Sequence, residues 1–302
     1  MQRLFFVRNN RNEIPTNLNP KRKRPQYFSL LQLFWRIEIG LLRILFKNPF
    51  KRRLEDETLK AEIRSIHKAS KKTYGVPRIH NRLQNKGKRL GKTRVSRLMR
   101  EEGLSAKSKK RFIPKTTVSD PSSNKAPRIY QIETAKVTKT NQVWASDLTY
   151  IPTKEGFMYL VVILDLFSRK VIGWDLSSDM LATRTHAAFI RALQHAQPGN
   201  RSIIFHSDQG SQYTEGPFRK RLKLMGFQQS MSRRGNCYDN AYVESFFHTL
   251  KNEIETPVFR TKKEAKETIF DYIETWYNSE RIHSSLGYLS PIEYEQKHKH
   301  AA

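Results

Sequence analysis

Three apolar segments separated by short turns restrict the fold of this 302-residue chain more than any other feature of its sequence. The segments are Val143–Ile151, Phe157–Leu166 and Lys170–Leu176. Each is rich in β-branched and aromatic residues and ends at turn residues, which is typical of a β-strand. Because a parallel connection needs a long crossover, strands joined by such short turns pair as an antiparallel meander. The sequence therefore predicts a sheet that begins near residue 143.

Helical and strand-like segments alternate after this meander. They are a helix over Ala182–Ala196, a strand over Ser202–His206, a helix over Phe218–Met225, a strand over Phe227–Met231 and a helix within Ser230–Glu253. Three strands followed by this alternation predict a mixed sheet with helices packed against it. We assign this part of the chain to the α/β class, with a sheet of the ribonuclease H type.

Three carboxylates interrupt the apolar pattern. Asp147 lies in the middle of the first strand, Asp208 just past the fourth, and Glu244 on the helix after the fifth. A carboxylate in an apolar strand carries a large desolvation cost and needs a partner. A ribonuclease H sheet places its first and fourth strands side by side, so the two aspartates would meet there beneath the helix. Each of the three, taken alone, is more often structural than catalytic.

The helix that carries Glu244 has two distinct faces. Spacing of i, i+3, i+4 and i+7 gives an apolar stripe of Val243, Phe246, Phe247 and Leu250. At ~100° per residue, a second face holds Asn240, Glu244, His248 and Lys251. This face is either a solvated polar surface with a Glu–His pair or part of a site built around Glu244.

The chemistry of these side chains favours a hard divalent cation. Carboxylates in one place repel one another unless cations bind, and oxygen ligands suit Mg²⁺ or Mn²⁺. The single cysteine, Cys237, excludes an internal disulfide and a Cys-based zinc site within one chain, and fits a reducing cytoplasm. His206 and His248 have no further His or Cys neighbours in sequence, and we interpret them as supporting residues.

Positive charge is concentrated in the first half of the chain. The net charge is +28, and residues 1–140 hold 36 Lys and Arg against 10 Asp and Glu. Such an arm indicates a polyanionic partner. Within the basic segment 1–53, charged residues interrupt the aromatic run Tyr27–Phe46. We therefore expect no membrane span there, because a span needs ~20 apolar residues, and the role of this segment stays open.

Residues 54–104 predict three short helices. The first contains Leu59, Ile63 and Ile66, and the others cover Arg78–Asn85 and Thr93–Glu102. In the third helix Val95, Leu98 and Met99 form the core side, and the opposite side carries Arg94, Arg97 and Arg100. This pattern resembles a helix-turn-helix whose recognition helix contacts DNA; the alternative is a solvated basic face. Residues 105–140 indicate a basic linker that can lie along phosphates before the core at 141–302.

Four motifs of the second half carry a resemblance to a known family. They cover residues 144–150 (WASDLTY), 164–169 (LDLFSR), 206–213 (HSDQGSQY) and 232–247 (SRRGNCYDNAYVESFF). Together they resemble the catalytic core of bacterial insertion-sequence transposases of the IS-three group, which is similar to retroviral integrases. Thirty-five residues separate Asp208 from Glu244, which matches the spacing of this group. Residues 277–291 resemble the family's C-terminal segment.

The resemblance implies that Asp147, Asp208 and Glu244 form a DDE triad that holds two Mg²⁺ or Mn²⁺ ions. The enzyme would cleave DNA at the ends of an element and transfer the strands to a target. Lys251 matches a family position that contacts DNA ends, and we expect Arg233 and Arg234 in the basic loop to contact DNA as well. Expected partners are element-end and target DNA, further copies of the chain and a separately encoded helix-turn-helix protein, on the nucleoid in a bacterial cytoplasm.

Two other functions remain open from the sequence. A nuclease or resolvase on the same fold would cut DNA without joining strands. A repressor with a decayed core would bind DNA without cutting it. The basic DNA-binding arm that accompanies the core counts against a nuclease or resolvase. The three intact carboxylates count against a repressor with a decayed core.

Overall fold

The computed structural model describes residues 35, 49–107, 125–131, 136–179, 182–199, 202–233, 240–254 and 256–299. The chain divides into two compact units, Met1–Glu57 and Thr58–Ala302. Apart from Trp35 and the residues from 49 onward, the predicted basic N-terminal segment lies outside the described residues, as does much of the linker. In the described ranges no helix combines the length and apolar content needed to cross a bilayer.

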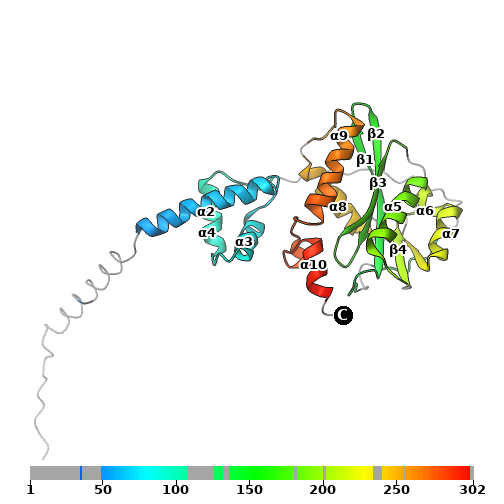
Figure 1. Cartoon of the computed structure of the whole chain (residues 1–302), viewed down its shortest axis with the longest axis horizontal. Helices are drawn as coiled ribbons and strands as arrows, with labels where there is room; N and C mark the ends of the chain where they lie inside the picture. Colours follow the sequence, from blue (N-terminus) through cyan, green and yellow to red (C-terminus); the bar gives the residue numbers. More distant parts are fainter. Residues whose placement is uncertain are drawn as a thin grey trace, which may run out of the picture. The chain divides into compact units, whose positions relative to one another are not determined.

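A five-stranded sheet in the order β3-β2-β1-β4-β5 forms the centre of the second unit (Figure 1). Its strands are β1 (Val143–Thr153), β2 (Gly156–Asp165), β3 (Val171–Ser177), β4 (Ile203–Ser207) and β5 (Phe227–Met231). The first three strands pair antiparallel, and β4 and β5 extend the sheet in parallel from β1. The predicted meander, the mixed sheet and the pairing of the first and fourth strands are confirmed.

Strand β1 continues two residues beyond its predicted end, through Pro152. Strand β4 pairs with β1 only as far as Ser146, so beyond that point none of the described strands lies beside this edge of β1. The carbonyl of Pro152 accepts the N–H of Phe259 on that side, 3.0 Å away. A proline that lacks an N–H is tolerated there because no ladder hydrogen bond is lost.

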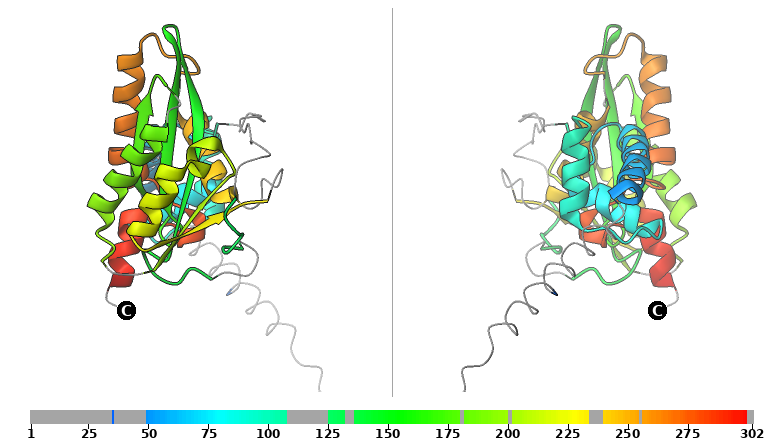
Figure 2. Two further views of the ribbon diagram at one scale, coloured as in Figure 1. Left: turned by 90° about the vertical axis from the view of Figure 1, so that its right-hand side faces the viewer. Right: turned by 90° about the vertical axis from the view of Figure 1, so that its left-hand side faces the viewer.

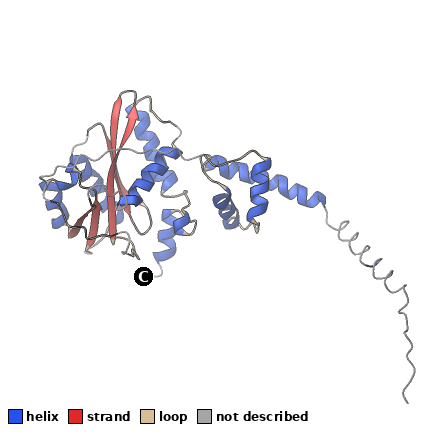
Figure 3. Ribbon diagram, turned by 180° about the vertical axis from the view of Figure 1, so that it is seen from behind, coloured by secondary structure: helices blue, strands red, loops and turns tan. Residues whose placement is uncertain are grey.

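Helices cover both faces of the sheet (Figures 2 and 3). One face packs against α5 (Ala182–Ala196), α6 (Ser211–Thr214) and α7 (Gly216–Leu224). The other packs against α8 (Ala241–Glu253), α9 (Lys262–Phe270) and the π-helix η2 (Asp271–Tyr277). Successive β1 residues enter the two cores alternately, as the period of a strand requires. The chain continues through η3 (Ser284–Leu286) to α10 (Pro291–His298).

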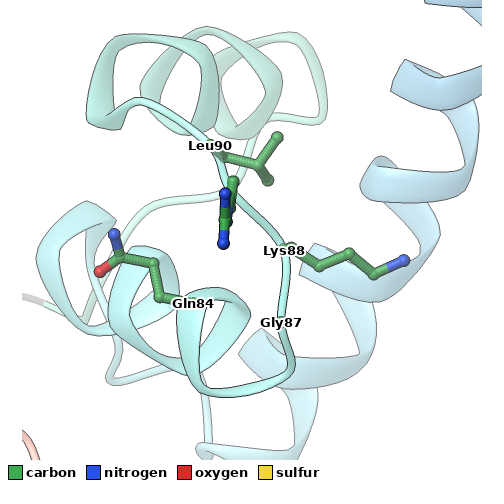
Figure 4. A pocket seen from close by; sticks show the side chains of 5 residues that line it. Gln84, Gly87, Lys88 and Leu90 are labelled. Atoms are coloured by element: carbon green, nitrogen blue, oxygen red, sulfur yellow. The ribbon is translucent and has the colours of Figure 1, made fainter.

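Three helices form the predicted helical unit. They are α2 (Pro49–Ala69), α3 (Val76–Asn85) and α4 (Lys92–Glu101). The apolar positions expected from the sequence are buried between them: Leu59, Ile63, Ile66, Val95, Leu98 and Met99. Gln84 and residues 87–90, in the turn between α3 and α4, line an open hollow of about 460 Å³ (Figure 4). From this turn Lys88 points toward α2 and pairs with Glu62 at 3.1 Å.

The core of the helical unit is completed by residues near the other end of the chain. Ile282 is fully buried among the apolar side chains of α2, α3 and α4, and Trp276 packs against the same cluster. The hydroxyl of Tyr74 accepts the backbone N–H of Ile282 at 2.8 Å. The guanidinium of Arg82 donates to the backbone carbonyl of Glu280 and to its carboxylate. The helical unit therefore packs on the segment between η2 and η3.

Candidate active site

The register of β1 and β4 places two aspartates side by side. Ser146 pairs with Ser207 in the parallel ladder, so Asp147 and Asp208 are the next residues along the two strands. Side chains two apart on a strand lie on one face, and Ala145 belongs to the core beneath α8. Both carboxylates therefore face α8, at the point where β4 ends and β1 continues.

Helix α8 crosses this part of β1 and contacts it near both of its ends. Its buried stripe of Val243, Phe246, Phe247 and Leu250 is the one expected from the sequence. At the start of the helix, Asn240 donates to the backbone carbonyl of Ser146 at 3.2 Å. Near the other end, the amino group of Lys251 donates to Oγ1 of Thr149 at 2.7 Å. Glu244 lies between these two contacts, opposite the aspartates.

The three carboxylates share one electrostatic environment. Burial raises the pKa of Asp147 well above its usual range, and the charges of Asp208 and Glu244 add to the effect. The Leu148 N–H, which donates to Asp147 at 2.8 Å, and the cation of Lys251 oppose this rise in pKa. Partial burial and the charge of Asp208 also raise the pKa of Glu244. Such mutual effects require that the three groups are neighbours.

The three carboxylates lie near one another, but they are not arranged around a single position at which a metal ion could bind. Among the residues that the structure describes, no three His, Cys, Asp or Glu side chains form a group that could hold a metal ion as they lie. The Asp208 carboxylate is oriented by a hydrogen bond that it accepts from the backbone N–H of Gly210 at 3.0 Å. Glu244 occupies an exposed position on α8.

Known protein families match most of the chain. The family model described as an integrase core domain matches residues 137–237, and a second one of that description matches 225–291. An HTH-like domain matches residues 53–112. These matches cover both the sheet with its carboxylates and the helical unit.

Full-length relatives give the family. The transposase for insertion sequence element IS904 from Lactococcus lactis is 43% identical over 255 residues, which cover 83% of this chain and 99% of the relative. The chain belongs to the IS3 family of insertion-sequence transposases. Transposase InsF for insertion sequence IS3A from Escherichia coli K12 is 38% identical over 257 residues, covering 84% of this chain and 86% of the relative.

Membership in the IS3 family identifies the activity. IS3-family transposases are polynucleotidyl transferases that cleave DNA and transfer strands in the transposition of an insertion element. The chain is also similar to the catalytic core domain of HTLV-2 integrase in complex with magnesium, with a TM-score of 0.41 and 15% identity over 53% of this chain and 99% of that one.

The remaining predicted contacts of this IS3-family chain lie on other elements. Arg94, Arg97 and Arg100, here the α4 arginines, belong to the helical unit; Arg94 is half-buried and the other two are exposed. Arg97 forms an ion pair with Glu101 one turn away. Arg233 is exposed just after β5, and Arg234 lies outside the described residues.

Two residues beside the carboxylates were not singled out from the sequence. Thr149 accepts the Lys251 hydrogen bond. It follows Asp147 by two residues, and strand periodicity places such residues on one face of the sheet, so this spacing could have identified it. Tyr213 on α6 lies on the opposite face of β1, where its hydroxyl is 2.8 Å from Oγ of Ser146. Burial and the charges of Asp147 and Asp208 raise the pKa of Tyr213 well above its usual value. No periodicity in the sequence indicates this contact.

The burial and mutual repulsion of the carboxylates predict that the stability of this IS3-family transposase depends on pH. Because the pKa of Asp147 is raised in the folded state, its ionisation opposes folding. The cost is absent below the unfolded pKa, ~3.9, grows as pH rises from there toward the folded pKa, and is constant above the folded pKa. Without divalent cations, Asp147→Asn should raise the free energy of unfolding at neutral pH by about 1 kcal/mol and leave it unchanged at acid pH. Denaturant unfolding at both pH values measures this, with Asp271→Asn as the exposed control.

Proposed function

We propose that this chain binds the ends of an insertion element and cleaves and joins DNA with Asp147, Asp208 and Glu244 as its catalytic carboxylates. The observation that carries the proposal is the meeting of three carboxylates from β1, the end of β4 and α8, each pair of which appears in the raised pKa values. A folded protein keeps such mutually repelling groups together when a function needs them.

We infer that these carboxylates hold Mg²⁺ or Mn²⁺, and that two ions bind. The donor set supports this, because it consists of oxygen ligands whose repulsion a cation would relieve. When bound, such ions lower the pKa of an attacking water or 3′-hydroxyl and stabilise the leaving 3′-oxygen. The side chain of Glu244 would rotate toward the aspartates as the protons leave.

Other residues hold the carboxylates in place. The Asn240 contact to the Ser146 carbonyl fixes the start of α8 over β1. The Leu148 and Gly210 N–H groups orient one carboxylate oxygen each, on Asp147 and Asp208. These contacts keep α8 at the distance from which Glu244 can reach the aspartates.

Lys251 is a cation that acts on Asp147, and we propose that it positions a DNA end. It is half-buried, burial lowers its pKa, and the charge of Asp147 acts in the opposite direction. Its amino group reaches β1 only two residues from Asp147. A phosphate next to the one that reacts would therefore find a cation there.

Lys251→Ala is expected to reduce strand joining by about 10- to 100-fold, the range of one charge-assisted contact of 1.5–3 kcal/mol. Lys251→Arg should restore much of the activity, because the role requires a charge. The control is Lys263→Ala, which removes an exposed lysine on α9. Joining of a labelled element end, measured at matched salt, decides the matter, and equal activity of the two alanine variants would exclude this role.

Sequence-independent affinity for DNA belongs, in this proposal, to the basic first half. We propose the division 1–53, 54–104, 105–140 and 141–302, in which the helical unit and the linker bind the element end. Arg233 and Arg234 would follow the DNA near the active site. We further infer that copies of the chain assemble on the DNA of the nucleoid, with a separately encoded helix-turn-helix protein as a further partner.

Replacing all three α4 arginines by Gln in the full chain should flatten the salt dependence of DNA binding. Each lost phosphate contact lowers the slope of log affinity against log salt by about 0.9. Arg260→Gln combined with Lys263→Gln and Lys266→Gln is the control, because all three are exposed on or beside α9. Fluorescence anisotropy across a salt series measures both slopes. If the slope falls by no more than it does in the control variant, the α4 arginines form a solvated basic face that does not contact DNA.

One reaction tests the function as a whole. The full chain, the element's own end DNA and Mg²⁺ are combined, and the products are separated on a denaturing gel. Nicked ends together with joined strands are the expected result. Cleavage without joining would indicate a nuclease or resolvase, and binding without either product would indicate a repressor.

A further inference from the structure

A pair of buried hydroxyl groups lies on the opposite face of the sheet from the carboxylates. The Oγ atom of Ser146 and the phenol oxygen of Tyr213 are 2.8 Å apart and share a hydrogen bond. Both residues are fully buried. Ser146 immediately precedes Asp147 on β1, and Tyr213 lies on α6, the short helix that follows Asp208. The pair therefore joins the strand of one aspartate to the helix that follows the other.

The pairing of β1 with β4 ends just before the two aspartates. Ser146 and Ser207 are the last partners in this parallel ladder. The chain then turns into α6: the Asp208 carboxylate accepts the N–H of Gly210, and the N–H of Tyr213 donates to the Gly210 carbonyl, both at 3.0 Å. The turn that orients Asp208 is thus the turn that begins α6. The distance between the two aspartates consequently depends on how α6 is held against β1.

Packing fixes the ring of Tyr213, so its hydroxyl reaches a defined point on β1. The ring contacts Phe205 of β4 and Phe218 of α7, whose ring centres lie 6.3 and 6.1 Å away. The Tyr213 carbonyl accepts a hydrogen bond from the amide of Gln229 on β5 at 2.8 Å. A phenylalanine would keep these contacts and lose the hydrogen bond to Ser146. The hydroxyl therefore supplies a tie between α6 and β1 that an apolar ring in the same place would lack.

Ser146 also contacts the residue that precedes the helix of the third carboxylate. Its backbone carbonyl accepts a hydrogen bond from the side-chain amide of Asn240 at 3.2 Å, and Asn240 comes directly before α8, which carries Glu244. Its side chain contacts α6, and its neighbour in the sequence is Asp147. One residue thus connects the elements that carry all three carboxylates. Buried hydrogen bonds of this kind make the groups that they join rigid with respect to one another.

We propose that the hydrogen bond between Ser146 and Tyr213 positions Asp208 relative to Asp147 for metal binding. The two hydroxyl groups lie on the far face of the sheet, so both are positioning residues that act through the carboxylates. Residues that orient metal ligands from behind commonly tune the affinity for the metal. Two apolar side chains would fill this part of the core without needing a hydrogen-bond partner, whereas the hydroxyl pair adds a fixed direction.

The inference rests on the proposed function in one respect, namely that Asp147 and Asp208 hold a divalent cation. Its test therefore measures metal binding directly, on the full chain without DNA. Mn²⁺ is added to the protein, and the electron paramagnetic resonance signal of free Mn²⁺ gives the amount bound. The difference between the wild type and Asp147→Asn defines the ions bound at the site.

Tyr213→Phe and Ser146→Ala should each weaken Mn²⁺ binding at the site by about 10- to 100-fold, the usual effect of removing a residue that orients a metal ligand. The double variant should lose no more than either single variant, because each substitution removes the same hydrogen bond. Losses that add in the double variant would show that the two hydroxyl groups act separately, which would overturn the proposal.

Strand joining of element-end DNA gives a second readout. Both variants should join slowly at low Mg²⁺ and regain much of the wild-type rate as Mg²⁺ is raised, because the defect lies in metal affinity. Their affinity for DNA without metal should equal that of the wild type. A joining defect that does not depend on the concentration of Mg²⁺ would indicate general damage to the fold and overturn the positioning role.

Tyr159→Phe and Ser177→Ala are the matched controls. Tyr159 is a half-buried tyrosine of β2 that packs on the same core as Tyr213. Ser177, buried at the end of β3, donates its hydroxyl to the carbonyl of Asp179 at 2.8 Å. Both control variants should bind Mn²⁺ as the wild type does, and thermal unfolding shows that every variant is folded at the temperature of the measurement.

Two outcomes separate this inference from the proposed function. If Tyr213→Phe and Ser146→Ala bind Mn²⁺ as tightly as the controls, the positioning role is overturned and the proposed function stands. If the wild type binds no more Mn²⁺ than Asp147→Asn, the proposed metal site is overturned, and this inference is overturned with it.

Discussion

Asp147→Asn, Asp208→Asn and Glu244→Gln are each expected to lower DNA cleavage and strand joining by about 10³-fold or more. The substitutions keep the size of the side chain and remove one charge from the group that β1, β4 and α8 bring together. Both reactions should fail together, because the proposed site serves both. Binding of DNA should persist or become slightly tighter, since a negative charge next to the phosphates is lost.

The measurement combines three readouts on the same preparations. Cleavage and joining of element-end DNA are followed in Mg²⁺ and again in Mn²⁺, and affinity is measured without either metal. Asp271→Asn, an exposed carboxylate at the junction of α9 and η2, should retain full activity. Near-normal cleavage by any one of the three active-site variants would show that its carboxylate is not part of the catalytic group.

Glu253→Ala is expected to destabilise the fold by about 3–5 kcal/mol, because it leaves a buried arginine without its partner. Glu253 ends α8 and is 3% exposed, and Arg281 is 5% exposed. The carboxylate also accepts hydrogen bonds from Tyr272 and from Trp276, both at 3.0 Å. It therefore connects the helix of Glu244 to the segment on which the helical unit packs.

Urea unfolding measures this loss, with Glu267→Gln as the control. Glu267 is an exposed partner of Lys263 on α9 at 3.9 Å, so its removal should change stability by no more than about 0.5 kcal/mol. Replacing both Glu253 and Arg281 by Met should cost less than Glu253→Ala alone, because no buried charge is left unpaired. A single-variant loss below about 1 kcal/mol would show that Arg281 finds other compensation.

Local patterns of sequence were sufficient for most of the fold. Strand and helix periodicities depend on neighbours within a few residues, so they predicted the meander, the stripe from Val243 to Leu250 and the three helices of the helical unit. The isolated carboxylates in apolar surroundings marked Asp147 and Asp208 in the same way. Combined with the known order of a ribonuclease H sheet, these signals predicted that the first and fourth strands would pair.

Contacts between distant segments required the tertiary structure. The packing of Ile282 among α2, α3 and α4, the Glu253–Arg281 pair and the contact of Asn240 with the Ser146 carbonyl join residues that no periodicity relates. Each depends on how helices and turns settle against one another, which is a property of packing rather than of local propensity. The sequence by itself determined the strands of the sheet, the helices of the helical unit and the candidate carboxylates, and the tertiary structure decided how the helical unit and α8 come together with the C-terminal segment.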